Sequence, residues 1–114
     1  MPVEDQLLID VRREKDRVVV SLRGELDLAS APLLQSEIQS SEIVSAAVLV
    51  LDLQELNFID STGLRVLLGA HKSSAERGQE FAVTRGSPQV QRLLSITGVG
   101  EHLRVIASPD ELLV

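Results

Sequence analysis

The stretch AAVLVLDLQELNFIDSTGLRVLLGAHK, from Ala46 to Lys72, carries the pattern that decides the fold. Its first part, Ala46 to Leu56, is a nearly continuous aliphatic run of strand length, which is typical of a strand covered on both faces in a parallel sheet. Its second part has leucines at the i, i+3 and i+4 spacing of an amphipathic helix (Leu64, Leu67 and Leu68), a row that His71 and Ala75 extend. The stretch therefore predicts a buried strand that leads into a helix from Ser61 to Arg77.

Strand and helix patterns alternate on both sides of this stretch. The other predicted strands are Gln6 to Arg13, Arg17 to Gly24, residues 79–86 and residues 102–107. Serines precede the other predicted helices: Ser30 as an N-cap with Pro32 in the first turn, Ser87 before a helix that Gly98 ends, and Ser108 in a capping box with Glu111. We expect one α/β domain over residues 1–114. Its sheet should be mostly parallel, with about five strands, an antiparallel edge strand and about four flanking helices.

The composition of the chain excludes several classes of function. Apolar residues make up 44% of the chain, with two Phe and no Trp or Tyr, so the core must be aliphatic. A net charge of -6 argues against nucleic acid and anionic membrane surfaces as partners, and leaves a protein partner with a basic face. The chain has no cysteine, which excludes disulfides and thiolate metal sites. No apolar run approaches the ~20 residues of a membrane span, so we expect a cytoplasmic protein without membrane insertion.

The residues do not support catalysis by this chain. The two histidines, His71 and His102, lie far apart in sequence and have no neighbouring ligand constellation, and a packed or half-exposed His71 is the better interpretation. Neither a phosphate-binding loop nor a nucleophile elbow is present. We therefore expect no catalytic residue, no metal and no cofactor. A small-molecule enzyme with its site at the sheet edge is the weakest of the hypotheses.

Ser61 has two compatible interpretations. Either Asp60 or Ser61 can cap the helix that follows, because both side chains accept hydrogen bonds from free N–H groups. A hydroxyl at this junction also lies at the carboxyl end of the strands, where α/β folds place their sites. A phosphate there would add about -1.5 to -2 charges. The helix N-terminus favours such a group, whereas Asp60 repels it.

With these residues in view, the sequence resembles the STAS-domain family, and most of all the bacterial anti-sigma factor antagonists. The resemblance covers nearly the whole chain and rests on three blocks in order: RGELDLASAP (Arg23 to Pro32), VLVLDLQELNFIDSTGLRVLLGAHK (Val48 to Lys72) and SPQVQRLLSITGVGEHLRVIAS (Ser87 to Ser108). The D-S-T-G-L core between a strand and a glycine-bearing helix is the most specific element.

The resemblance implies a phosphorylation cycle. An anti-sigma factor that is itself a serine kinase would bind the unphosphorylated protein, releasing sigma factor, and would phosphorylate Ser61 to end the binding. A metal-dependent serine phosphatase would restore the first form. Thr62 is a competing acceptor. Arg65 would reach an acidic group on the partner or a phosphate on Ser61, or would remain solvated. The implied partner-binding residues are Glu25, Leu26, Asp27, Asp60, Thr62, Gly63, Leu64 and Arg65. The alternative is a STAS scaffold or accessory module of a stressosome-like or transport assembly, in which the same residues make constitutive contacts.

Overall fold

The computed structural model describes residues 7–112, which alternate between strands and helices. The elements in chain order are β1 (Leu7–Glu14), β2 (Arg17–Leu26), α1 (Ala31–Ile38), α2 (Ser41–Val44), β3 (Val48–Ile59), α3 (Ser61–Arg77), β4 (Glu80–Thr84), α4 (Pro88–Thr97), the 3₁₀ turn η1 (Val99–Glu101), β5 (Val105–Ile106) and the 3₁₀ turn η2 (Pro109–Leu112). The strands form one sheet in the order β1-β2-β3-β4-β5. β1 pairs antiparallel with β2, and the other pairs are parallel. The expected mixed sheet with an antiparallel edge strand is confirmed.

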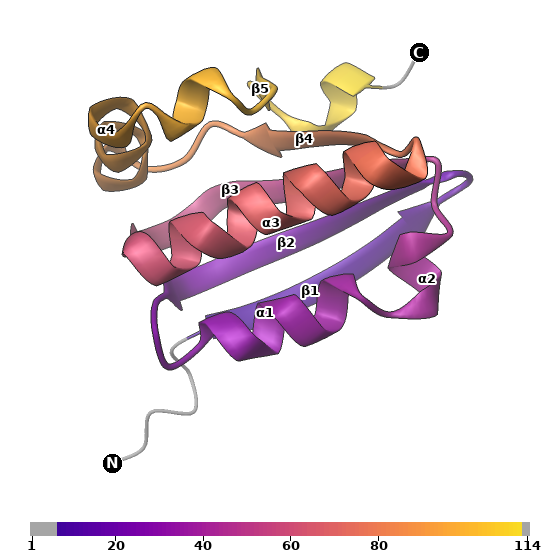
Figure 1. Cartoon of the computed structure of the whole chain (residues 1–114), viewed down its shortest axis with the longest axis horizontal. Helices are drawn as coiled ribbons and strands as arrows, with labels where there is room; N and C mark the ends of the chain where they lie inside the picture. The colour runs from indigo at the N-terminus through magenta and orange to yellow at the C-terminus, as the bar shows by residue number, and fades with distance from the viewer. Residues whose placement is uncertain (1–6, 113–114) are drawn as a thin grey trace.

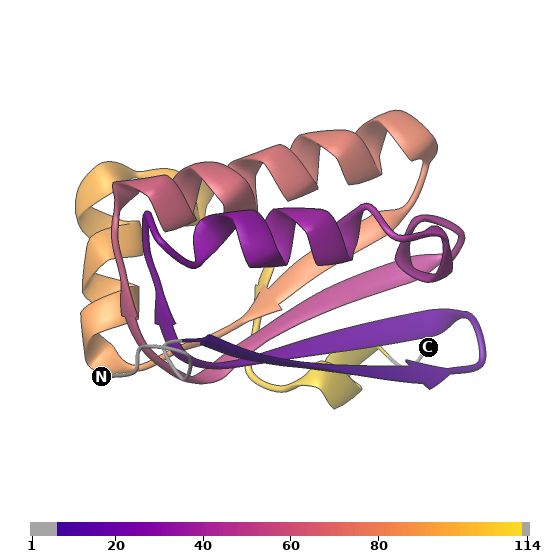
Figure 2. The same ribbon diagram turned by 90° about the horizontal axis from the view of Figure 1, so that it is seen from below.

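The two faces of the sheet are covered unequally. α1 and α3 lie side by side over one face, while η2 lies against the other (Figures 1 and 2). Most of the aliphatic core lies between the helices and the sheet, with Leu51 of β3 and Leu67 of α3 fully buried. A smaller cluster on the opposite face consists of Val19, Val50, Ala82 and Ile106. β3 is therefore buried on both faces only in its first part, because Asp52 is partly exposed and Gln54 is exposed.

β2 and β3 are longer than the sequence predicts. Gly24 was expected to end its strand, but β2 continues to Leu26, and β3 continues to Ile59. Gly24 has a φ of 106° beside a shift in the pairing register, so the glycine allows an irregularity within the strand. The added residues pair with one another, Leu26 opposite Ile59. Both loops that follow therefore start at the same end of the sheet.

The helix ends confirm some expected caps and correct others. Ser87 caps α4 by accepting from the amide of Val90 at 3.4 Å, and Gly78 and Gly98 end α3 and α4 with positive φ. Ser30 occupies the expected N-cap position of α1, but its side chain makes no capping hydrogen bond to the helix. Its hydroxyl donates to the carbonyl of Glu25 and accepts from the amide of Asp27, so it stabilises the β2–α1 loop instead.

Three further differences concern the helices. The short helix α2 has no counterpart in the sequence prediction, and the terminal helix is only the 3₁₀ turn η2. The Glu111 side chain, and with it the predicted capping box, lies outside the described side chains. The buried row of α3 continues through Ala70 and Ser74 rather than Ala75, which is exposed.

Candidate functional site

The predicted site residues gather at one end of the sheet, which we call the tip and define as residues 25–30 and 60–65. β2 and β3 are parallel and end together, so the β2–α1 loop and the start of α3 are neighbours. The tip occupies the left-hand end of the molecule in Figure 1, where α3 begins. The carboxyl ends of parallel strands are the usual location of binding sites in α/β folds.

Asp60 holds the two parts of the tip together. One carboxylate oxygen, Oδ1, accepts from the amide of Gly63 at 3.0 Å and caps α3. The other, Oδ2, accepts from the amide of Leu28 in the neighbouring loop at 3.1 Å. The amide of Asp60 in turn donates to the carbonyl of Leu26 at 3.2 Å. Asp60, rather than Ser61, is therefore the cap, and its carboxylate serves the fold with both oxygens.

Ser61 is the first residue of α3 and is exposed. Its hydroxyl makes no hydrogen bond with any residue in the described range 7–112. Within the same range, the amides of Ser61 and Thr62 donate to no backbone or side-chain acceptor. Free amides at a helix N-terminus attract anionic groups, including phosphate. The fold thus leaves the Ser61 hydroxyl available beside an arrangement that accommodates a phosphate.

Gly63 brings α3 close to the end of β2. A Cβ on Gly63 would lie 2.7 Å from the carbonyl oxygen of Leu26 and 2.7 Å from Cγ1 of Ile59. Only a residue without a side chain fits there. Leu26, Gly63 and Leu64 are buried, so these three predicted contact residues form the base of the tip and do not present side chains at its surface.

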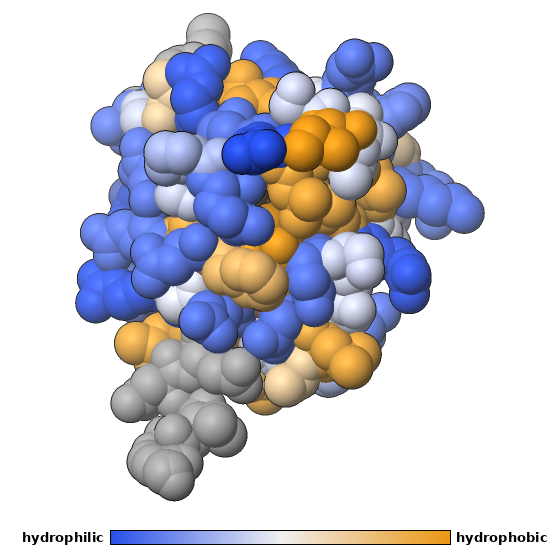
Figure 3. Space-filling model, turned by 90° about the vertical axis from the view of Figure 1, so that its left-hand side faces the viewer, coloured by the Kyte–Doolittle hydropathy of each residue, from blue (hydrophilic) through white to orange (hydrophobic). Residues whose placement is uncertain are grey.

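The outer surface of the tip combines charged and apolar side chains. Of the predicted residues, Glu25 and Arg65 are exposed, while Asp27 and Thr62 are partly exposed. Sequence reasoning missed Leu28, which is 73% exposed, and Phe58 near the end of β3, which is 39% exposed. Figure 3 looks onto this end of the molecule and shows hydrophobic areas between hydrophilic ones. A leucine in an otherwise polar loop was the available signal for Leu28.

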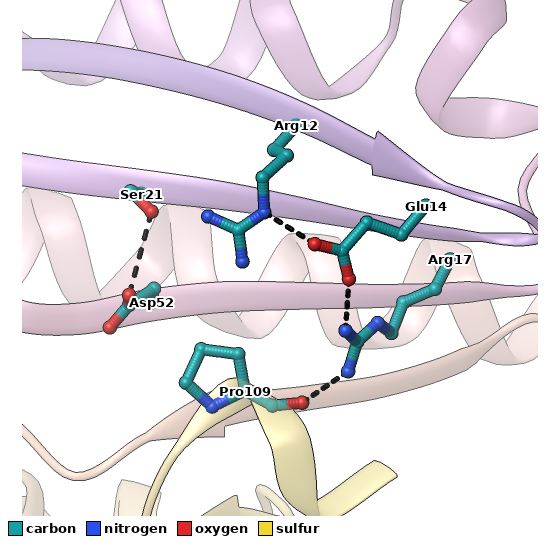
Figure 4. Close-up of polar contacts among 6 residues, drawn as sticks. All are labelled: Arg12, Glu14, Arg17, Ser21, Asp52 and Pro109. Atoms are coloured by element: carbon teal, nitrogen blue, oxygen red, sulfur yellow. Dashed lines mark hydrogen bonds and ion pairs between the residues drawn. The ribbon is translucent and has the colours of Figure 1, made fainter. Parts of the chain in front are cut away.

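A second polar cluster lies at the opposite end of the sheet (Figure 4). The Arg17 guanidinium donates to the Glu14 carboxylate and to the carbonyl of Pro109, which joins the β1–β2 hairpin to η2. Arg12 donates to the same carboxylate at 2.7 Å. The hydrogen bond from Arg17, followed by that from Arg12, lowers the pKa of Glu14 from its ordinary value of 4.5. This cluster stabilises the fold and lies far from the tip.

The described residues contain neither a cluster of metal ligands nor a membrane-spanning helix. Among the described residues, no group of three or more His, Cys, Asp or Glu side chains is arranged to hold a metal ion. No helix in that part of the chain has the length and apolar character needed to cross a membrane.

Known proteins share both this fold and this sequence pattern. The STAS domain model matches residues 9–112. The anti-sigma-B factor antagonist of Listeria monocytogenes is 32% identical over 93 residues, covering 82% of this chain and 82% of the relative. That of Bacillus subtilis is 28% identical over 102 residues, covering 90% and 93%.

Solved structures of known proteins show the same fold. The anti-sigma factor antagonist of Mycobacterium paratuberculosis superposes with a TM-score of 0.86 at 26% identity, covering 99% of this chain and 96% of that one. The Bacillus cell fate determinant SpoIIAA, solved in its phosphorylated form, has the same fold, with a TM-score of 0.70 at 20% identity and coverage of 93% and 96%.

The chain therefore belongs to the STAS domain family. Its relatives within that family carry the name anti-sigma factor antagonist. That name describes a regulator and not an enzyme.

Proposed function

We propose that this protein is an anti-sigma factor antagonist switched by phosphorylation of Ser61. In the unphosphorylated form it binds an anti-sigma factor that is also a serine kinase, and sigma factor is released. Phosphorylation of Ser61 by that kinase ends the binding, and a metal-dependent serine phosphatase reverses it. The cycle would take place in the cytoplasm. The names of the relatives support the partner class, and the resemblance of the D-S-T-G-L segment supports the cycle.

The observation that carries the proposal is the contrast between Ser61 and Asp60. The Asp60 carboxylate is occupied on both oxygens by amides, whereas the Ser61 hydroxyl is exposed and engages no described residue. A kinase can therefore reach the hydroxyl without breaking a hydrogen bond of the fold. Thr62 is only partly exposed and lies one residue further into α3, which favours Ser61 as the acceptor.

A phosphate on Ser61 would act on binding more than on folding. It places about -1.5 to -2 charges at the surface of the tip. The free amides at the start of α3 offset part of that charge within the protein. A partner surface that fits the neutral hydroxyl would instead meet a buried, unpaired anion, and such a mismatch costs several kcal/mol in affinity.

The test uses the anti-sigma factor kinases of the source genome, assayed one at a time with ATP. Mass spectrometry of the product should place one phosphate on Ser61, and Thr62→Ala should accept it as the wild type does. Ser61→Ala should bind the kinase and resist inactivation, whereas Ser61→Asp should bind at least tenfold more weakly in titration calorimetry. Ser95→Asp, on the exposed surface of α4, is the matched control and should bind as wild type does. Equal affinity of Ser61→Asp and wild type would refute the switch.

A further inference from the structure

A groove separates α1 and α3 on the helical side of the sheet. The two helices lie side by side in both ribbon views (Figures 1 and 2), and the space between them encloses about 340 Å³. Its deep surface is apolar, formed by Ala31, Ile38, Leu49 and Ala70, all of them buried. Thr62 and Arg65 border it near the tip. The groove therefore begins where the candidate phosphoacceptor site ends.

Gly69 keeps this groove open. It lies within α3, where glycine is destabilising relative to alanine. A Cβ built on Gly69 meets no atom within 4 Å, so the fold itself does not require a glycine there. Gly63 on the same helix is the opposite case, because its Cβ would collide with the backbone of β2. The effect of Gly69 is to leave room above the apolar surface.

The charge of the groove is opposite to that of the protein. The chain carries a net charge of -6, yet Arg65 and Arg77 border the groove, and no Asp or Glu side chain of the described residues lines it. Arg77 donates to Gln79 at 2.9 Å. The Arg65 guanidinium is exposed and makes no hydrogen bond or ion pair with any residue from 7 to 112. A guanidinium in this state favours a carboxylate or phosphate.

The size of the groove fits a small ligand better than a protein segment. Sites for small molecules typically enclose about 300–1,000 Å³, and this groove lies at the lower end of that range. A helix with its side chains is about 10–12 Å across and would rest on the groove without entering it. Arg65 and Arg77 are twelve residues apart on one helix, so the groove extends roughly 18 Å.

We propose that the groove binds a small amphipathic anion. Its carboxylate or phosphate head pairs with Arg65 beside the tip, and its aliphatic tail lies along the apolar surface past Gly69 toward Ile38. The binding needs only this chain, so it can be measured without the kinase, on the unphosphorylated protein.

The test is a titration of the isotopically labelled protein followed by NMR. The probes are decanoate and decyltrimethylammonium, which carry opposite charges on chains of equal length, both kept below the concentration at which they aggregate. Decanoate should shift the signals of α1 and α3 and bind at least tenfold more tightly than the cation. Gly69→Leu should weaken decanoate binding at least tenfold by filling the groove, and Arg65→Gln should remove the preference for the anion. Arg92→Gln, on the exposed surface of α4, is the matched charge control and should leave binding unchanged.

Three results would overturn the proposal. These are the absence of saturable decanoate binding, equal affinity of Gly69→Leu and wild type, or signal shifts that map away from α1 and α3. Circular dichroism of each variant verifies folding, and the open space around a Cβ at Gly69 shows that the backbone there accepts a side chain. Arg65→Gln changes an exposed side chain, so it tests the head group without depending on the larger substitution.

Discussion

Gly63 and Gly69 lie six residues apart in α3 and have opposite relations to their surroundings. The first has backbone and side-chain atoms within 3 Å of a built Cβ, and the second has none within 4 Å. We expect Gly63→Ala to lower the free energy of unfolding by about 1–3 kcal/mol, since overpacking forces the helix away from β2. Gly69→Ala should raise it by about 0.5–1 kcal/mol, because alanine favours the helix.

Urea denaturation followed by far-UV circular dichroism measures both substitutions under the same conditions. Because Gly69→Ala changes the same residue type in the same helix, it serves as the internal control for helix propensity. Similar destabilisation by both substitutions would show that the contact of Gly63 with Leu26 and Ile59 does not determine the position of α3.

Among the elements, the β1–β2 hairpin has a stability that depends on pH through the carboxyl group of Glu14. Its pKa is lowered in the folded protein, first by Arg17 and then by Arg12, so the ionised form stabilises the fold. This contribution is fully present above the ordinary pKa of 4.5 and is lost as pH falls below it through the folded pKa. Glu14→Gln should therefore lose less stability than wild type when pH is lowered through this range.

Urea midpoints measured at a series of acid pH values test this expectation. Glu76→Gln provides the control, because Glu76 is an exposed carboxylate on α3 without an ion pair in the described range. Its stability should follow the wild-type pH dependence. A Glu14→Gln curve parallel to that of wild type in acid would contradict the proposed contribution of the Arg17 hydrogen bond.

Apart from the short helix α2, the order of the elements was predictable because the main strands and helices have local signals. The aliphatic run of β3, the leucine spacing of α3 and the Ser87–Gly98 boundaries of α4 depend on residues close together in sequence. The ends of β2 and β3 were not predictable, since those residues are ordered by pairing with each other across the sheet. The side-chain contacts of Ser30 were not predictable because its partners, Glu25 at the end of β2 and Asp27 in the loop that follows, precede the helix.

The candidate site was likewise predictable only in part from the sequence. That Asp60 and Ser61 lie at the start of a helix was predictable from the strand and helix patterns around them. The contact from Asp60 to the amide of Leu28 joins residues 32 positions apart, and no local pattern indicates it. The groove beside Gly69 depends on how α1 packs against α3, so it became visible only in the structure.

For the molecule as a whole, two apolar clusters share one sheet. The larger lies under α1 and α3, and the smaller lies on the face beside η2. Because β2, β3 and β4 contribute side chains to both, neither cluster can be lost without breaking strands that the other needs. We expect a single cooperative unfolding transition.

Methyl NMR during urea titration can follow each cluster separately. Signals from Leu67 report the helical face and those from Val50 the opposite face. Both should disappear at the same urea concentration. An earlier midpoint for Val50 would show that the smaller cluster opens independently of the helical face.

The contact between Arg17 and the carbonyl of Pro109 joins residues 92 positions apart, and this has a consequence for protein synthesis. At about 5–20 residues per second, the ribosome adds Pro109 roughly 5–20 s after Arg17. During that interval Val19 and its neighbours have been synthesised, but η2, the turn that will lie beside them, has not. The β1–β2 hairpin must therefore remain soluble on the ribosome through most of translation, and the charged pair of Arg12 and Glu14 on β1 provides hydrophilic surface next to it from the outset.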